Sequence, residues 1–443
     1  MYPTYLSDII IKNYKGIKEL ELSFPPKPGV TILLGDNGVG KTSILQAIAT
    51  GLSGYLEGVR GSSPRNILLQ DIRIHTETLG GASTAIEQIT PAQIYCRADI
   101  NGEQFEWERS RELAKAGHGI SSRTWYSTTN STLRSFAQKL TNDTQAMLPV
   151  LSFLSTNRLS EAERLLIDDT SKLIDKVEQK LHDRRSGYAG CLRNTIDKSL
   201  IKAWVLKMDM EHYFRGHEIP EYEAFKEIVS TTMMIMSELP HPPKLYYSRQ
   251  FRDIVYEEYG HPLPISYLSA GYQSLLWIIM DIAFRIALLN PQFGMDMRHT
   301  SGIVLIDELD MHLHPKWQWN VLHALQEVFP NIQFIVATHS PILISSCKNE
   351  YLIHIDQEHQ VTYPTTVYGY SVDDVVEFVQ GSSRIPRKAK KLYSKFEDAL
   401  NEDDFQTARK ILNEMIEEYG KNNSEVQIAM TELSMADPSY TEE

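Results

Sequence analysis

Hydrophobic positions near the start of the chain follow first the period of strands and then that of a helix. Three strands are expected, at Ile9–Lys12, Ile17–Phe24 and Val30–Leu34. From Lys41 to Leu52 the apolar residues recur every four positions and lie on one helical face. The segment therefore predicts a strand, a glycine-rich loop and a helix in succession.

The remaining pattern predicts a core that is split by an inserted helical lobe. Further strands are expected at Ala92–Asp99, Gln104–Arg109 and Leu148–Leu154. Residues 160–185 are charged with one apolar stripe, which indicates helix, and residues 388–419 predict a two-helix hairpin whose apolar face packs on the core or docks another protein. We divide the chain into an N-terminal core segment, a helical insertion, a C-terminal core segment, and a hairpin with a tail, at residues 1–157, 158–242, 243–385 and 386–443.

Composition narrows the class of protein. The three cysteines among 443 residues are too far apart for a disulfide framework or a zinc site. A formal net charge of −13 argues against a surface that mainly holds nucleic-acid phosphates. Two short basic runs, at residues 180–185 and 384–391, are of the kind that usually forms solvated helix faces, with a local nucleic-acid role as the alternative. With no leader pattern and no run of 18 uncharged apolar residues, we expect a cytoplasmic protein.

Residues 35–42, Gly-Asp-Asn-Gly-Val-Gly-Lys-Thr, fit the phosphate-binding P-loop pattern between an apolar strand and an amphipathic helix. Glycines let backbone N–H groups turn toward a β-phosphate, Lys41 reaches the β and γ oxygens, and the Thr42 hydroxyl ligates Mg2+. The candidate nucleotide-binding residues are Gly35, Asn37, Gly38, Val39, Gly40, Lys41, Thr42 and Ser43.

The apolar run Ile303–Ile306 ends in two carboxylates, Asp307 and Glu308, as a buried strand does when its end faces a ligand. Asp307 is the candidate metal residue, and Glu308 the candidate catalytic residue that orients the attacking water. His339 follows another apolar strand and is the candidate donor to the γ-phosphate.

The segment Leu268-Ser269-Ala270-Gly271-Tyr272 opens an apolar helix, and helix N-termini attract anions. Ser269 and the Gly271 amide are therefore candidate phosphate ligands. Because the P-loop already serves one side of the γ-phosphate, we expect them to act on a nucleotide presented by a partner subunit.

Together these segments resemble the ABC ATPase superfamily in its SMC and RecF-like branch. The resemblance implies an α/β fold with a split mixed sheet, a D-loop at Asp310, and a basic residue, Lys15, that approaches the nucleotide. The signature differs from that branch because Ala270 and Tyr272 replace a glycine and a glutamine. Asn157, at the junction with the helical lobe, is the candidate sensor of the metal and the attacking water; a strand-ending turn without function is the alternative.

Four phrases, at residues 148–153, 187–192, 269–285 and 307–318, resemble the PtuA family, the ATPase subunits of Septu-type anti-phage systems. This resemblance implies a slow Mg2+- and ATP-dependent hydrolase that dimerises head to tail. It also implies a regulatory role over an HNH-type nuclease partner (PtuB-like), with DNA reached only through that partner and no membrane. The alternative is a RecF/SMC-like repair or clamp ATPase acting directly on DNA, against which the low pI counts.

Two negative expectations follow from spacing. After His339 no Asp-x-Asp pair follows an apolar strand, so we expect no nuclease activity of the chain's own. His312 and His314 are two residues apart, on different faces of an expected helix, without an acidic or cysteine ligand at a supporting interval. We therefore expect these histidines to be structural and not zinc ligands.

Overall fold

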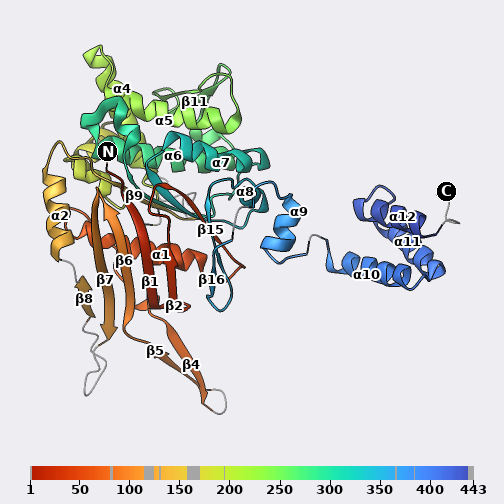
Figure 1. The fold of residues 1–443 in the computed structure, drawn as a ribbon. Helices are drawn as coiled ribbons and strands as arrows, with labels where there is room; N and C mark the ends of the chain where they lie inside the picture. The colour runs from red at the N-terminus through yellow and green to blue at the C-terminus, as the bar shows by residue number, and fades with distance from the viewer. Residues whose placement is uncertain are drawn as a thin grey trace. The chain divides into compact units, whose positions relative to one another are not determined.

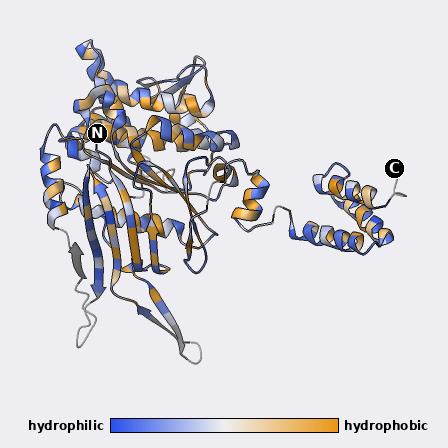
Figure 2. Cartoon of the chain, in the orientation of Figure 1, coloured by the Kyte–Doolittle hydropathy of each residue, from blue (hydrophilic) through white to orange (hydrophobic). Residues whose placement is uncertain are grey.

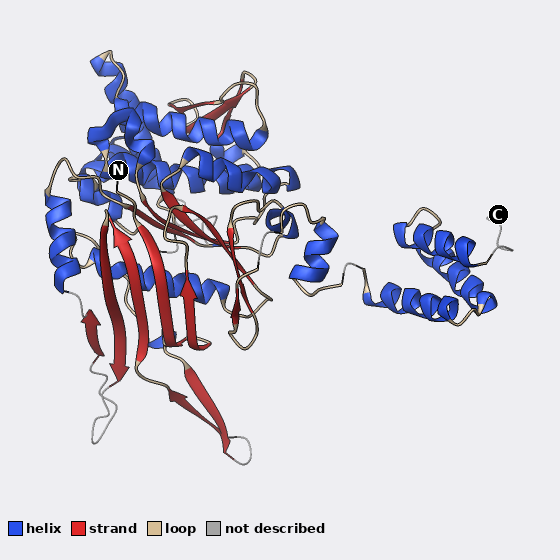
Figure 3. Cartoon of the chain, in the orientation of Figure 1, coloured by secondary structure: helices blue, strands red, loops and turns tan. Residues whose placement is uncertain are grey.

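The computed structural model describes residues 2–79, 83–113, 124–128, 131–156, 170–193, 195–364, 367–383 and 385–437. The chain divides into two compact units, residues 1–369 and 370–443 (Figures 1 and 3). The first unit holds the sheets and most of the helices, and the second is helical among its described residues.

A five-stranded antiparallel sheet forms one layer of the first unit, in the order β2-β1-β6-β7-β8. Buried and half-buried residues alternate along β6, as expected for a strand with one face on a core. The strands span Tyr5–Tyr14 (β1), Ile17–Ser23 (β2), Ala92–Ile100 (β6), Glu103–Leu113 (β7) and Thr124–Thr128 (β8). A hairpin that the sequence did not predict, β4 (Ile74–Leu79) and β5 (Ser83–Gln88), extends from this layer in Figure 1.

The second main sheet has the order β16-β15-β3-β14-β13-β9, and all its strands are parallel except β16. The strands span Gly29–Leu34 (β3), Val150–Leu154 (β9), Gly302–Asp307 (β13), Ile332–Ala337 (β14), Tyr351–Ile355 (β15) and Val361–Thr362 (β16). Every residue of β9, β13 and β14 is buried, because both faces of this sheet are covered. The mixed sheet confirms the α/β fold class.

Helix α1 (Lys41–Leu56) packs against strands of both sheets. Two glycines let the antiparallel sheet come close: a Cβ at Gly51 would lie 2.4 Å from the Cys96 sulfur, and one at Gly54 would lie 2.5 Å from the Trp107 ring nitrogen. Trp107 donates a hydrogen bond of 2.7 Å to the Gly51 carbonyl. These contacts position the loop that precedes α1.

A helical layer covers the parallel sheet. Its main helices are α3 (Thr170–Lys180), α4 (Lys198–Arg215), α5 (Pro220–Ser237), α6 (Ala270–Leu289) and α7 (Pro315–Val328). The other helical elements of this unit are η1 (Leu69–Asp71), α2 (Ser131–Asn142), η3 (Arg184–Tyr188), η4 (Ile265–Tyr267), η5 (Pro291–His299) and α8 (Pro341–Ser345). An unpredicted three-stranded sheet, β10 (Lys244–Ser248), β11 (Asp253–Glu258) and β12 (His261–Pro264), contacts α4 and α5. These strands directly follow residue 242, where we expect the C-terminal core segment to begin.

Helix α6 is the central core helix of this layer and is largely hydrophobic in Figure 2. It is long and apolar enough to cross a membrane, but 83% of its most apolar window is buried within the fold. Within this helix Arg285 and Asp281 form an ion pair at 2.8 Å. Asp281 also accepts a hydrogen bond of 2.9 Å from Ser152 of β9, and Arg285 donates one of 2.9 Å to the Gly187 carbonyl. The phrases at 187–192 and 269–285 thus have a shared structural role.

The second unit contains α9 (Val372–Asp374), η6 (Val375–Val379), α10 (Arg387–Asn401), α11 (Phe405–Tyr419) and α12 (Ser424–Ala436). The predicted hairpin corresponds to α10 and α11, but the expected tail contains a third helix. Its start is capped by Asn423, whose side chain accepts from the Glu425 N–H at 2.9 Å. The apolar residues of the three helices bury one another: Phe396, Ala399, Ala408, Leu412, Met415, Val426, Ala429, Met430 and Leu433. The unit begins near residue 370, earlier than the expected boundary at 386.

Candidate nucleotide-binding site

A cavity of about 350 Å3 lies at the carboxyl ends of β13 and β14, beside the start of α1. Three separate segments line it, and they follow the neighbouring parallel strands β3, β14 and β13. The lining residues are Asn37, Gly38, Gly40, Lys41, Thr42, Ser43, Asp307, Glu308, Ala337, Thr338 and His339. The structure thus brings most of the sequence-predicted phosphate and acidic residues into one cavity.

Glycines are required at the turns of the P-loop. Gly38 and Gly40 have φ of +91° and +92°, a left-handed conformation that L side chains rarely adopt. At Gly35 a Cβ would lie 2.3 Å from the Ile355 carbonyl oxygen of β15, so the loop and this strand could not approach as they do. Gly40 is the N-cap of α1, which directs the first N–H groups of the helix toward the cavity.

Lys41 is buried and folds back onto its own loop. Its ammonium donates to the carbonyls of Gly35 at 2.5 Å and Asp36 at 3.0 Å. Burial lowers the pKa of Lys41 to about 8, although the carboxylates of Asp36, Asp307 and Glu308 oppose this shift. A lysine ammonium held in a glycine-rich loop beside a helix N-terminus is suited to a phosphate ligand.

The two carboxylates at the end of β13 differ in backbone conformation. Asp307 completes the buried strand and is 1% exposed. Glu308 lies just beyond it with φ of +46°, an uncommon conformation for a residue with a side chain. Such local strain is concentrated at functional sites. The turn directs Asp307 and Glu308 into the same cavity.

The segment after β14 connects the cavity to the D-loop. His339 is half-buried, and burial together with the charge of Lys41 lowers its pKa, so the imidazole is neutral near pH 7. The Thr338 hydroxyl donates to Asp310 and accepts from the Ser340 N–H at 3.0 Å. Thr338 was missed from the sequence; its position between an apolar strand and His339 was the available signal.

The signature segment does not line this cavity. Ser269 is exposed and is the N-cap of α6, with no hydrogen bond from its side chain to the helix. Gly271 is buried, and a Cβ there would lie 2.5 Å from the His312 carbonyl oxygen in the turn before α7. Tyr272 packs edge-on against Trp317 of α7, with ring centroids 4.4 Å apart. The signature is therefore fixed to the segment that follows Glu308, while its serine faces outward.

The remaining candidates lie elsewhere. Lys15 does not line the cavity; its ammonium bonds the Gln46 side chain and lies 3.6 Å from the buried carboxylate of Asp71. Asn157 falls outside the described residues. His312 and His314 precede α7 and are not on a helix, which corrects the expected placement: His312 has φ of +67°, and His314 caps α7 by accepting from the Lys316 N–H at 3.2 Å.

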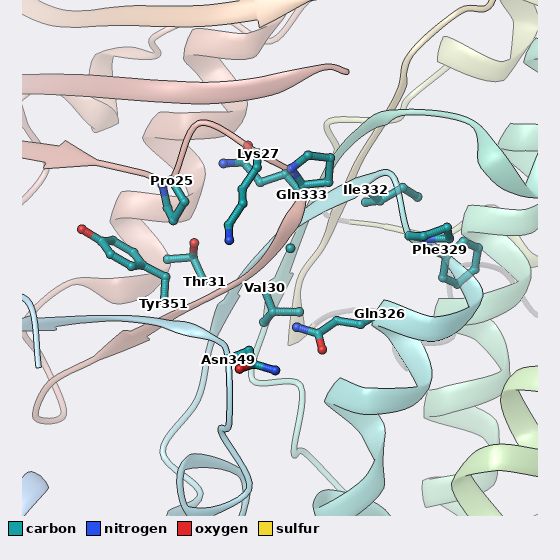
Figure 4. A pocket seen from close by; sticks show the side chains of 13 residues that line it. Pro25, Lys27, Val30, Thr31, Gln326, Phe329, Ile332, Gln333, Asn349 and Tyr351 are labelled. Atoms are coloured by element: carbon teal, nitrogen blue, oxygen red, sulfur yellow. The ribbon is translucent and has the colours of Figure 1, made fainter. Parts of the chain in front are cut away.

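A second cleft opens at the opposite ends of the parallel strands (Figure 4). Its lining includes Lys27, Thr31, Gln326, Asn349 and Tyr351. The described residues that line it include no carboxylate. The cleft lies at the amino ends of β3 and β14, whereas ligands of open parallel sheets bind at the carboxyl ends. The cavity at the P-loop is therefore the better candidate.

Comparisons with known proteins agree with this geometry. A family model described as an AAA domain matches residues 8–199. Another, described as an AAA domain, putative AbiEii toxin, Type IV TA system, matches residues 157–345. The Retron Vc95 probable ATPase of Vibrio cholerae is 24% identical over 85% of this chain and 79% of its own length. The Septu protein PtuA of Bacillus thuringiensis is 24% identical over 90% of each chain.

The chain therefore has the features of a P-loop ATPase and is similar to proteins named as ATPases. Among solved structures, the Smc head domain from Pyrococcus furiosus bound to the C-terminal domain of ScpA aligns with 82% of this ATPase and 96% of its own chain, at 16% identity and a TM-score of 0.47. The donor set of the ATPase also fits a divalent cation beside the nucleotide, because Thr42 and Asp307 present hard oxygen ligands to one cavity.

Proposed function

We propose that the ATPase hydrolyses Mg·ATP at a site completed by the signature serine of a second copy. The observation that supports this proposal is that Ser269 lies apart from the P-loop cavity of its own chain. P-loop, acidic and histidine groups share one cavity, whereas Ser269 opens α6 on an exposed surface outside it. A helix N-terminus with an exposed serine suits a phosphate, and its own P-loop is not positioned beside it. A head-to-tail homodimer supplies the missing ligand to both sites.

Within each site the residues have separate tasks. Thr42 and Asp307 would hold Mg2+, which when bound neutralises charge on the phosphates. When nucleotide binds, the Lys41 ammonium would leave the carbonyls of Gly35 and Asp36 and donate to the β- and γ-phosphate oxygens. Glu308 would orient and polarise the attacking water, and neutral His339 would donate to the γ-phosphate. Thr338, next to His339, would hold Asp310 in position through the hydrogen bond from its hydroxyl.

We further propose that this hydrolysis is slow and regulatory, in an anti-phage defence complex in the cytoplasm. The relatives named Septu protein PtuA and retron ATPase support a defence role. In this proposal nucleotide-dependent dimerisation controls an HNH-type nuclease subunit, which reaches DNA, and the ATPase itself has no nuclease chemistry. The alternative, a RecF/SMC-like clamp, would act on DNA without that partner.

Plasmid cleavage tests the division of labour. The purified ATPase should leave supercoiled plasmid intact with Mg2+ or Mn2+, with or without ATP. The same ATPase co-purified with an HNH-type subunit should cleave it. A Glu308→Gln variant in the same complex is the control that connects cleavage to hydrolysis, since it should alter nuclease control while keeping the complex together. Cleavage by the ATPase alone that an active-site substitution of its own abolishes would favour the clamp reading.

A further inference from the structure

Helix α10 carries a basic surface that the nucleotide site does not use. From Arg387 to Lys395 it has five cations and no acidic residue. Lys388 is paired with Glu418 of α11. The other four, Arg387, Lys390, Lys391 and Lys395, are exposed, and we define them as the basic stripe. At about 100° per residue they occupy roughly 140° of the helix circumference, on the side away from the buried Phe396.

This arrangement opposes the stability of the helix. Cations at a helix N-terminus interact unfavourably with its dipole, and α10 has its acidic residues, Glu397 and Asp398, in the C-terminal half. Arg387 and Lys391 are four residues apart, as are Lys391 and Lys395, so like charges also face each other along the stripe. Charges that destabilise a helix, without a nearby interaction that offsets their cost, are characteristic of functional surfaces.

Neighbouring residues of the described chain do not neutralise the stripe. Among the described residues, none of its four cations has a hydrogen-bond or ion-pair partner, although α11 and α12 are rich in acidic residues. By contrast, Arg409 of α11 is paired with Asp437, and Tyr393 of α10 donates to Glu432 at 3.0 Å. Polar groups near the core of this unit are therefore paired, whereas the basic stripe is exposed to solvent.

We propose that the basic stripe binds the phosphate backbone of double-stranded DNA, which gives the ATPase a DNA contact of its own in addition to the one expected through the nuclease partner. The stripe is about 12 Å long, at 1.5 Å per residue, and a DNA duplex presents one phosphate charge per roughly 1.7 Å of its axis. Protein interfaces usually need apolar or aromatic anchors, and the aromatic residues of α10, Tyr393 and Phe396, face the core of the unit instead. Single-stranded binders stack bases on exposed aromatic side chains, which the stripe lacks.

Salt-dependent binding of the full chain tests this proposal. A labelled 30-base-pair DNA duplex of mixed sequence is titrated with the wild-type chain at several salt concentrations. Neutralising about four phosphates predicts a log–log slope near −3 to −4. The variant R387Q/K390Q/K391Q/K395Q should lose at least about tenfold in affinity at low salt, with a slope near zero. The single strand of the same sequence should bind less tightly than the duplex.

A matched variant separates position from total charge. Lys18, Lys139, Lys410 and Lys421 are exposed cations outside the stripe, and changing all four to Gln removes the same formal charge. This control should bind duplex DNA within about threefold of wild type. The stripe variant should also unfold at the same temperature as wild type or higher, because it relieves repulsion. No duplex binding by wild type, or equal loss in both variants, would overturn the proposal. So would loss of an acidic protein partner from the stripe variant while duplex binding stays unchanged.

Discussion

The P-loop cavity and the start of α6 both present groups suited to phosphate, but they are built in opposite ways. The cavity is lined by three segments, Lys41 is buried in it, and Glu308 has φ of +46°. At α6 the backbone is held just as firmly, since Gly271 packs on the turn at His312, yet Ser269 is exposed. A serine that is held on an exposed surface, outside the cavity of its own P-loop, is placed to meet a phosphate presented by another copy. This difference supports division of one site between two copies.

The largest expected effect separates chemistry from binding inside the cavity. Glu308→Gln keeps the size of the side chain but removes the group that polarises water. Turnover should fall by at least about a hundredfold, while nucleotide affinity stays within a few-fold of wild type. Steady-state phosphate release and equilibrium binding measure the two quantities. Wild-type turnover in Glu308→Gln would show that the catalytic base lies elsewhere.

A smaller effect concerns the charge of Lys41. With a pKa of about 8 before nucleotide binds, Lys41 loses its proton as pH rises through 8. Phosphate favours the protonated form, so binding above pH 8 takes up a proton and weakens. A nonhydrolysable ATP analogue should bind roughly twentyfold more weakly at pH 9.5 than at pH 7.5. Lys41→Arg stays charged and is the control. Equal pH dependence in the two proteins would refute the assignment.

The smallest effect tests the coupling between the two regions. Gly271→Ala places a Cβ against the His312 carbonyl, and overpacking of this kind costs about 1–3 kcal/mol. Alanine favours a helix more than glycine does, which offsets part of this free-energy cost. We therefore expect a modest fall in melting temperature and a several-fold fall in turnover. The matched control is Gly16→Ala, where no atom lies within 4 Å of the added carbon. Equal melting temperatures and turnover in the two variants would show that the contact does not couple the regions.

Local sequence determined most of the catalytic geometry, because each motif lies directly at the end of a strand or the start of a helix. The pattern of residues 35–42 requires positive φ at Gly38 and Gly40, and the apolar runs before Asp307 and His339 are the buried β13 and β14. The approach of Gly271 to His312 could not be predicted, since it depends on the packing of α6 against a turn some forty residues away.

Other elements were missed for identifiable reasons. The strands β10–β12 form a small sheet beside α4 and α5, where the Pro240–Pro243 break masked the short strand pattern that follows. Lys15 is expected near the nucleotide from resemblance alone, and that expectation stays a prediction; in the fold its ammonium lies 3.6 Å from the buried carboxylate of Asp71. The third helix of the second unit has a capping signal in Asn423-Ser424-Glu425, but the segment lies beyond the predicted hairpin, where we expect a tail.

Mixing two inactive variants tests the shared site most directly. Lys41→Ala removes the P-loop cation, and Ser269→Arg blocks the phosphate ligand that is expected to act on the partner. A heterodimer of the two has one site with both defects and one intact site. Random mixing in equal amounts should therefore restore about a quarter of wild-type ATPase activity, although each variant alone is inactive. Activity that stays at the level of the separate variants, in heterodimers verified by differential tags, would contradict the account and place a complete site within one chain.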